Sequence, residues 1–400
     1  MTLTMKEQNK IEVIQGVMDG RIKVEEGGRV LNRSVRQIFR MLKRLREKGL
    51  EGLQHGNKGK KSPRKIKEEI RKKIIALAKG NLRDINDTHL SEILLREEKI
   101  RISRQALRRM LREEGIQAKR KRRHPKHRSR RERKEAFGMM LQIDGSPHDW
   151  LEGRGPRLTL IGAKDDATSF VWARFEKTET TWGYMDLMKE IFISKGLPLS
   201  LYSDRHTIFH SPKEPTIVEQ INNIRPLTQF GRAMEEVGVT IIKAWSAPAK
   251  GRIENQWGTF QDRLVVEMRL AGIKTQEEAN RFLEPFLKAY NQQFCVIPKK
   301  QESAFRQSPP PSQLDRILCL KETRKVNKDH TISFEGLVLQ IPPSKKFYSI
   351  AKQKVKVLQL KDGSVEIVYK QQMVARFCPE AIQRLVEKNN NETSQLKKAA

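Results

Sequence analysis

Apolar residues in the first 117 positions recur every three or four residues, which is the spacing of one face of a helix. The pattern predicts two groups of three short helices, one within residues 1–54 and the other within residues 64–117. Ser34 and Ser103 stand just before the last helix of each group, where a serine side chain can cap the first turn. Glycine, lysine and proline over residues 55–63 indicate a flexible linker between the groups.

Both helical groups resemble helix-turn-helix modules, whose third helix enters the major groove of DNA while its apolar face packs on the other two. The alternative is an ordinary three-helix bundle with a solvated basic surface. Arginine and glutamine can make paired hydrogen bonds to guanine and adenine edges. The candidate DNA contacts of the first group are Arg33, Ser34, Arg36, Gln37, Arg40 and Lys43. Those of the second group are Arg104, Gln105, Arg108 and Arg109.

From Phe137 the pattern changes to short apolar runs that glycine, proline and aspartate interrupt. Three successive runs predict an antiparallel meander of strands, and a helix over residues 180–194 follows. Two further strands then alternate with helices, and the last helix is long. This order predicts an α/β domain over residues 137–306, with a mixed sheet and helices on both of its faces.

Two of the predicted strands end in a carboxylate. Leu141-Gln142-Ile143 leads into Asp144 and a Gly-Ser turn, and Leu201-Tyr202-Ser203 leads into Asp204. Glu254 lies in the first turn of the long helix, after Lys250 and Arg252. Asp-Gly is also a common hairpin turn, so Asp144 alone could be a surface residue, and the three carboxylates could be unrelated. Their places on strand ends and a helix start favour convergence at one rim of the sheet.

The last part of the chain has the pattern of small antiparallel sheets. Prolines at positions 309–311 mark a linker, and short alternating segments follow it. Lys361-Asp362-Gly363-Ser364 predicts a hairpin turn. We therefore expect a small β-barrel over residues 325–386 and a disordered tail over residues 387–400.

The formal net charge of +32 points to a polyanionic partner, and nucleic acid is the usual one. A dense basic segment over residues 118–136 cannot pack into a core and is predicted to be a linker along phosphate, although a nuclear-localisation signal would look similar. Its candidate DNA contacts are Lys119, Arg120, Lys121, Arg122 and Arg123. No apolar run reaches the roughly 18 residues of a membrane span, and three scattered cysteines favour the reducing cytoplasm.

Asp144, Asp204 and Glu254, with Ser246-Ala247-Pro248 and Lys250-Gly251-Arg252-Ile253-Glu254-Asn255 around the glutamate, resemble the DDE triad of transposases and retroviral-type integrases. More narrowly, the chain resembles integrase-core transposases of bacterial insertion sequences, of the ISNCY kind. The resemblance implies a multidomain protein, with tandem helix-turn-helix modules, a ribonuclease-H-like core and an SH3-like barrel. No HHCC zinc module precedes the core.

The resemblance also implies an activity. The three carboxylates would hold two Mg²⁺ ions, for which Mn²⁺ can substitute, and the enzyme would cut double-stranded DNA at the ends of its element and join those ends to target DNA. Such a reaction needs two ends held together, so we expect at least a dimer on DNA and no membrane partner. The alternatives are a DNA-binding regulator with a relict core and a structure-specific nuclease.

Smaller expectations concern the surroundings of the triad. Asp204 lies 60 residues after Asp144 (204 − 144), and the interval to Glu254 contains a proline-bearing insertion between His210 and Pro226, which puts Asp204 most in doubt. Lys250 and Arg252 are placed to hold phosphate, and Gln261 could reach a terminal base. Gly145 would leave room for the scissile phosphate. Asp165 and Asp166 are expected to be turn residues or supporting groups.

Overall fold

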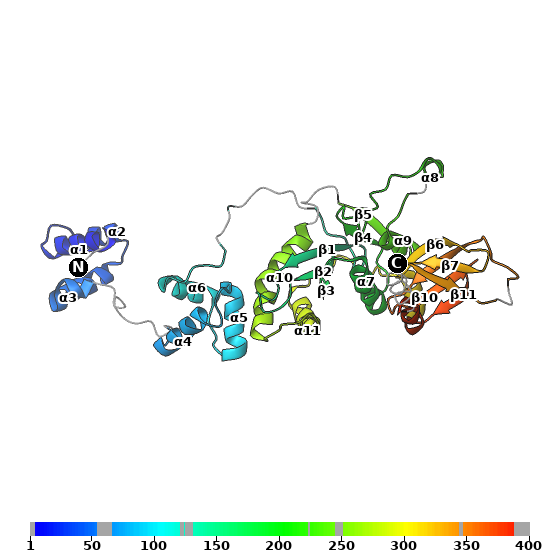
Figure 1. Cartoon of the computed structure of the whole chain (residues 1–400). Coiled ribbons are helices and arrows are strands. Elements are labelled where there is room, and N and C mark those ends of the chain that lie inside the picture. Colours follow the sequence, from blue (N-terminus) through cyan, green and yellow to red (C-terminus); the bar gives the residue numbers. More distant parts are fainter. Residues whose placement is uncertain are drawn as a thin grey trace. The chain divides into compact units, whose positions relative to one another are not determined.

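The structure is a computed structural model that describes residues 5–53, 66–120, 124, 131–222, 225–244, 251–343 and 347–387 (Figure 1). The chain divides into two compact units, Met1–Ile75 and Ala76–Ala400, and each is described by itself. The predicted linker at residues 55–63 and positions 388–400 of the predicted tail lie outside the described residues, as do four predicted DNA contacts. These are Lys121, Arg122, Arg123 and Lys250.

The first unit begins with the three predicted helices and a short 3₁₀ turn. Their bounds are α1 (Met5–Met18), α2 (Val24–Leu31), α3 (Val35–Lys48) and η1 (Gly49–Leu53). The Ser34 hydroxyl caps α3 as expected, accepting a hydrogen bond from the Gln37 backbone N–H at 3.4 Å. Ile14 of α1 packs with Ile38 and Leu42 of α3 in one apolar cluster, so this helical group has its own small core.

A second set of helices follows with α4 (Glu68–Lys79), α5 (Asp87–Glu98) and α6 (Arg104–Glu113). Ser103 caps α6 as predicted, and Asn86 caps α5 by accepting from the backbone N–H groups of Thr88 and His89 at 3.1 and 2.9 Å. α5 contacts α6, and Leu94 and Leu107 are fully buried. The helical prediction for the N-terminal part is thus confirmed.

The core of the second unit is a five-stranded mixed sheet. Its strands are β1 (Leu141–His148), β2 (Leu158–Asp165), β3 (Val171–Glu176), β4 (Ser200–Ser203) and β5 (Thr240–Lys243). They lie in the order β3-β2-β1-β4-β5, in which β1, β2 and β3 are antiparallel while β4 runs parallel to β1 and β5 parallel to β4. The predicted meander and mixed sheet are therefore confirmed.

Helices cover both faces of this sheet (Figure 1). The helices within residues 181–317 are α7 (Thr181–Lys195), α8 (Ile217–Ile221), α9 (Gln229–Glu236), α10 (Gly251–Leu270), α11 (Gln276–Phe294) and α12 (Pro311–Ile317). Ile161 of β2 packs in the cluster of α7 and α9, whereas its neighbour Leu160 packs in the cluster of α10 and α11. Because both faces of the sheet are covered, β2 is buried at nearly every position instead of at every second one.

One feature of the core departs from the sequence expectations, and a second agrees with them. Leu314 and Ile317 of α12 belong to the α7 cluster, so the apolar core continues beyond residue 306. The segment between His210 and Pro226 carries α8 on a projecting loop, and Ile217 and Ile221 are each 75% exposed (Figure 1). The predicted insertion thus leaves the order of β4 and β5 in the sheet undisturbed.

The C-terminal part consists of two antiparallel sheets. Their strands are β6 (Leu320–Lys325), β7 (Thr331–Phe334), β8 (Leu337–Gln340), β9 (Lys354–Gln359), β10 (Val365–Tyr369) and β11 (Gln372–Phe377). Four strands form the order β11-β10-β9-β6, and β7 pairs with β8. The predicted turn joins β9 to β10, and Gly363 has φ +85° there, a conformation that glycine adopts without strain.

No helix in the described ranges is both long and apolar enough to cross a membrane.

Candidate active site

Asp144 lies in the middle of its strand and not at its end. β1 continues to His148, so the predicted Gly145-Ser146 turn is wrong: both residues pair with β2, opposite Ile161 and Leu160. On its other side β1 pairs with β4 only at Leu141 and Gln142. Asp144 therefore lies beyond the last β1–β4 pair. It is at the rim of the sheet on that side, although β1 continues to His148.

The register between β1 and β4 places Asp204 level with Asp144. Leu141 pairs with Leu201, an offset of 60 residues (201 − 141), which is the same offset that separates Asp144 from Asp204. β4 ends at Ser203, and Asp204 follows it directly. The backbone N–H of His206 donates to Asp204 Oδ1 at 3.0 Å and holds this carboxylate in a local turn. Two of the three candidate carboxylates thus lie at the same level on neighbouring parallel strands, beyond the last β1–β4 pair.

α10 lies along β1 and touches it at every fourth helical residue. The Ile253 backbone N–H donates to Gln142 Oε1 at 3.3 Å, Trp257 Nε1 to Asp144 Oδ2 at 3.1 Å, and Gln261 Nε2 to Ser146 Oγ at 3.2 Å. Four residues of a helix rise about 6 Å and two residues of a strand span about 6.6 Å, so successive contacts have nearly the same spacing along α10 and β1. The match makes α10 parallel to β1.

Trp257 can reach Asp144 because a glycine faces it. Gly162 pairs with Asp144 across the ladder, and a Cβ there would lie 2.6 Å from the Trp257 ring. Glu254 lies one turn before Trp257 and is exposed. The described residues include no group of three His, Cys, Asp or Glu side chains close enough to hold a metal ion, so the structure does not bring Asp144, Asp204 and Glu254 together in one cluster.

A further carboxylate at this site, that of Glu179, was not predicted from the sequence. Its carboxylate lies over Gly145, where an added Cβ would be 2.9 Å from the carboxylate carbon, and it accepts a hydrogen bond from the Tyr184 hydroxyl at 2.6 Å. Burial raises the pKa of Tyr184 well above its usual range, and the charges of Glu179, Asp144 and Asp204 raise it further. Gly145 therefore makes room for Glu179. The only sequence signal was a carboxylate just before the capping residue Thr180.

This packing predicts a coupling between Gly145 and Glu179. Gly145→Ala should cost about 1 kcal/mol in the free energy of unfolding, because the new methyl displaces Glu179 from the Tyr184 hydroxyl. In a Glu179→Ala background the same change should cost almost nothing, since the obstructing carboxylate is gone. Urea unfolding of the four proteins in the cycle measures the coupling, and strictly additive effects would contradict this account.

Asp165 and Asp166 are buried supporting groups. Asp166, 1% exposed, pairs with the guanidinium groups of Arg131 and Arg252 and accepts from Gln142 Nε2 at 2.9 Å. Burial alone would raise the pKa of Asp166, but the backbone N–H of Lys134 and the two arginines lower it on balance. Asp166 therefore connects the basic segment, β1 and the start of α10. The Arg252 guanidinium, which was predicted to hold phosphate, is paired with the Asp166 carboxylate.

Lys164 completes this polar cluster. It lies opposite Gln142 on β2, and its ammonium donates to Gln256 Oε1 at 3.0 Å and to the Arg252 carbonyl at 3.3 Å. Burial, together with the charges of Arg133 and Arg252, lowers the pKa of Lys164 to about 8. The start of α10 is thus held to the sheet by polar groups on both β1 and β2.

No family model matches the chain. The chain is, however, 32% identical over 372 residues to the putative transposase y4bF of Sinorhizobium fredii, a match that spans 92% of this chain and 80% of the relative. It is also 30% identical over 403 residues to the transposase for insertion sequence IS1202 of Streptococcus pneumoniae, spanning 90% of this chain and 84% of that one. The chain belongs to the transposases. The predicted family is therefore confirmed.

Solved structures add only weak likenesses to this transposase. The simian T-cell lymphotropic virus intasome in complex with PP2A regulatory subunit B56 gamma has a TM-score of 0.34 and 11% identity, covering 76% of this chain and 99% of that chain. The HTLV-2 integrase catalytic core domain in complex with magnesium has a TM-score of 0.27 and 13% identity, covering 37% and 82%. With scores below 0.5, the assignment to the transposases is based on the two relatives alone.

The structure distributes the candidate DNA contacts of the transposase over several surfaces. The six candidate contacts of the first helical group, at the start and on the outer face of α3, are all exposed. The four candidate contacts on α6 are exposed as well. Gln261 is engaged with Ser146, and the Lys119 ammonium lies 3.0 Å from the Asp262 carboxylate. The predicted contacts of the first group are therefore accessible, whereas Gln261 and Lys119 have partners within the chain.

Proposed function

We propose that this chain is a DDE-type polynucleotidyl transferase, which cuts DNA at the ends of its element and transfers the freed strand into target DNA. The observation that carries the proposal is the shared register of Asp144 and Asp204 at the end of β4, beside the helix that bears Glu254. This arrangement combines with membership of the transposases to single out these three carboxylates among the acidic residues of the core.

The donor set suits a hard divalent cation. Mg²⁺ binds through one or two carboxylates, with water and substrate phosphate completing its shell, so Asp144 and Asp204 on adjacent strands are sufficient protein ligands to begin a site. We propose that Asp144 is common to two Mg²⁺ sites and that Asp204 and Glu254 each complete one, with Mn²⁺ able to replace Mg²⁺. Two bound cations would activate the attacking oxygen and stabilise the leaving oxygen in phosphodiester transfer.

The chain's own residues have distinct tasks in this proposal. The Trp257 N–H orients the Asp144 carboxylate by binding its Oδ2 atom, and the Asp166 cluster fixes the start of α10 next to Glu254. Tyr184 holds Glu179 beside Gly145 and keeps a fourth negative charge at a defined place near Asp144. Orientation of carboxylates by neighbouring groups is a general feature of metal sites and affects metal affinity.

The other parts of the chain are proposed to bring DNA to this site. We propose that the helices within residues 1–54 and 64–117 are helix-turn-helix modules for double-stranded DNA, joined to a ribonuclease-H-like core at residues 137–306. The exposed basic side chains on α3 and the net charge of +32 support the first role. The C-terminal sheets would form an SH3-like barrel, and at least two copies of the chain would hold two DNA ends.

The test uses purified full-length protein and DNA that carries the inverted repeats flanking its coding region. With Mg²⁺ or Mn²⁺ the protein should nick the repeat ends and join them to a second DNA, and EDTA should stop both steps. Sequence-specific binding without metal-dependent cutting would instead identify a regulator. Cutting of any structured DNA without strand joining would identify a nuclease.

A further inference from the structure

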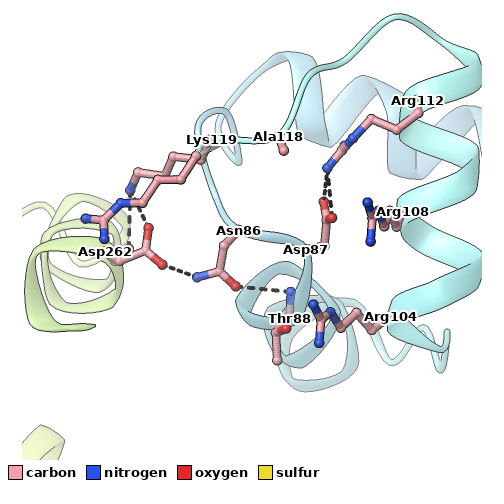
Figure 2. Close-up of a pocket in the computed structure, with 10 residues that line it drawn as sticks. Asn86, Asp87, Thr88, Arg104, Arg108, Arg112, Ala118, Lys119 and Asp262 are labelled. Atoms are coloured by element: carbon pink, nitrogen blue, oxygen red, sulfur yellow. Dashed lines mark hydrogen bonds and ion pairs between the residues drawn. The ribbon is translucent and has the colours of Figure 1, made fainter. Parts of the chain in front are cut away.

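A cationic cleft lies between α6 and α10 in the second unit. It encloses about 650 Å³, and Arg104, Arg108 and Arg112 line its α6 wall (Figure 2). Lys119, Arg120 and Asp262 line the opposite wall. Five basic and two acidic side chains face the cleft, which leaves an excess of three positive charges in a confined space. Such a concentration of charge attracts a polyanion.

The two acidic side chains are already engaged. Asp87 binds Arg112 through both oxygens, at 3.0 and 2.8 Å, and Asp262 pairs with Lys119 and with the Asn86 amide (Figure 2). Within the part of the chain that the structure describes, no side chain pairs with Arg104 or Arg108. The uncompensated charge of the cleft therefore resides on these two arginines and on Arg120.

Arg104 and Arg108 are four residues apart, so they lie on one face of α6, separated by about 6 Å along its axis. Figure 2 shows them in a row with Arg112 on the side of α6 that faces the cleft. The guanidinium group presents a planar set of donors that fits phosphate oxygens in pairs. Gln105 and Arg109 are exposed on the adjoining face of α6 and do not line the cleft.

Ion pairs between α5 and α10 hold the walls of the cleft together. Arg263 of α10 binds Glu92 of α5 at 2.6 Å, and Glu267 accepts from the His89 ring at 2.8 Å and from Arg96 at 2.8 and 3.0 Å. Burial would raise the pKa of Glu267, but His89 and Arg96 lower it to about 2. The second helical group is thereby fixed on the helix that carries Glu254.

The cleft leads toward the candidate active site. The Arg120 guanidinium lies 3.9 Å from the position of a Cβ at Gly258, and Gly258 is one turn beyond Glu254 on α10. A strand bound along Arg104, Arg108 and Arg120 would therefore continue along the face of α10 that begins at Glu254.

We propose that this cleft binds the phosphodiester backbone of a single DNA strand next to the active site, a proposal that rests on the proposed function. Its volume is that of a small-ligand pocket, which fits a strand and not a duplex. The cleft face of α6 is thus assigned to phosphate, and any contact with the bases of a duplex is left to the Gln105 and Arg109 face. The four candidate DNA contacts of α6 are thus divided between two faces of the helix.

The test compares Arg104→Ala/Arg108→Ala with Arg101→Ala, a control that removes an exposed arginine just before α6 that does not line the cleft. Binding of the full-length proteins to a single-stranded oligonucleotide in EDTA is measured over a range of salt concentrations. The double variant should lower the slope of log K against log salt by about 1.4, since each phosphate contact on a single strand contributes about 0.7. Arg101→Ala should leave the slope unchanged.

Two results would overturn the proposal. One is an equal loss of slope in Arg101→Ala and the double variant, which would mean that the strand does not lie in the cleft. The other is an unchanged slope in the double variant, if inorganic phosphate raises the melting temperature of the native protein but not that of the double variant. That combination would mean that the cleft binds only a small anion. Because EDTA prevents catalysis, the outcome is independent of whether Asp144 is a metal ligand.

Discussion

Replacing Asp144 with asparagine should reduce both DNA cleavage and strand joining by at least about 1,000-fold, equivalent to about 4 kcal/mol of transition-state stabilisation. The substitution preserves size and leaves an oxygen for the Trp257 N–H, which binds Asp144 at 3.1 Å in the native protein. It removes the negative charge that two cations are proposed to share. Gel analysis of end-labelled DNA with Mg²⁺ measures both steps.

Asp149→Asn is the matched control for this experiment. Asp149 lies just after β1 and accepts a hydrogen bond from the Gly153 backbone N–H at 3.1 Å, away from the β4 end. Its replacement should change the rates less than about twofold. Equal losses in both variants would indicate a general disturbance of β1 and would remove the support for Asp144 as a metal ligand.

Replacing Asp166 with alanine should lower the free energy of unfolding of the second unit by about 2 kcal/mol, because it leaves the guanidinium groups of Arg131 and the half-buried Arg252 without their carboxylate. The Gln142 amide and the Lys134 backbone N–H lose the same acceptor. Urea unfolding followed by circular dichroism measures the loss. Glu132→Ala removes an exposed ion pair, with Lys299 at 3.6 Å, and should cost less than about 1 kcal/mol.

The Asp166 effect should also depend on pH. Its pKa is lower in the folded protein than the ordinary value of 3.8, so the ionised form stabilises the fold above that pH. As pH falls below 3.8, Asp166 becomes protonated and the difference between the native protein and Asp166→Ala should shrink. A difference that stayed constant from pH 7 to pH 3 would show that Asp166 acts through packing and not through its charge.

Local patterns were sufficient to predict the main elements of the fold. The spacing of apolar residues predicted the helices, and the short apolar runs predicted the mixed sheet. The 60-residue interval between Asp144 and Asp204 also proves to be the register offset of β1 and β4. Asp204 follows the end of β4 as predicted, and the parallel pairing of β1 and β4 places it level with Asp144 although β1 runs on.

Other features depend on distant pairing and could not be predicted locally. Asp-Gly-Ser has the composition of a turn, but pairing of Gly145 and Ser146 with Ile161 and Leu160 of β2 keeps β1 extended. Glu179 reaches the site only because α7 brings Tyr184 beneath it. Arg108 and Arg109 are adjacent and chemically identical, and only the docking of α5 on α10 gives them different surroundings.

Binding of Mn²⁺ to the full-length protein with its end DNA tests the proposed metal site most directly. Electron paramagnetic resonance of free Mn²⁺ counts the bound ions, independently of catalysis. We predict two ions per chain in the native protein and fewer than one in Asp144→Asn, because Asp144 is proposed to be common to both sites. Two bound ions in Asp144→Asn, or none in the native protein, would contradict the assignment.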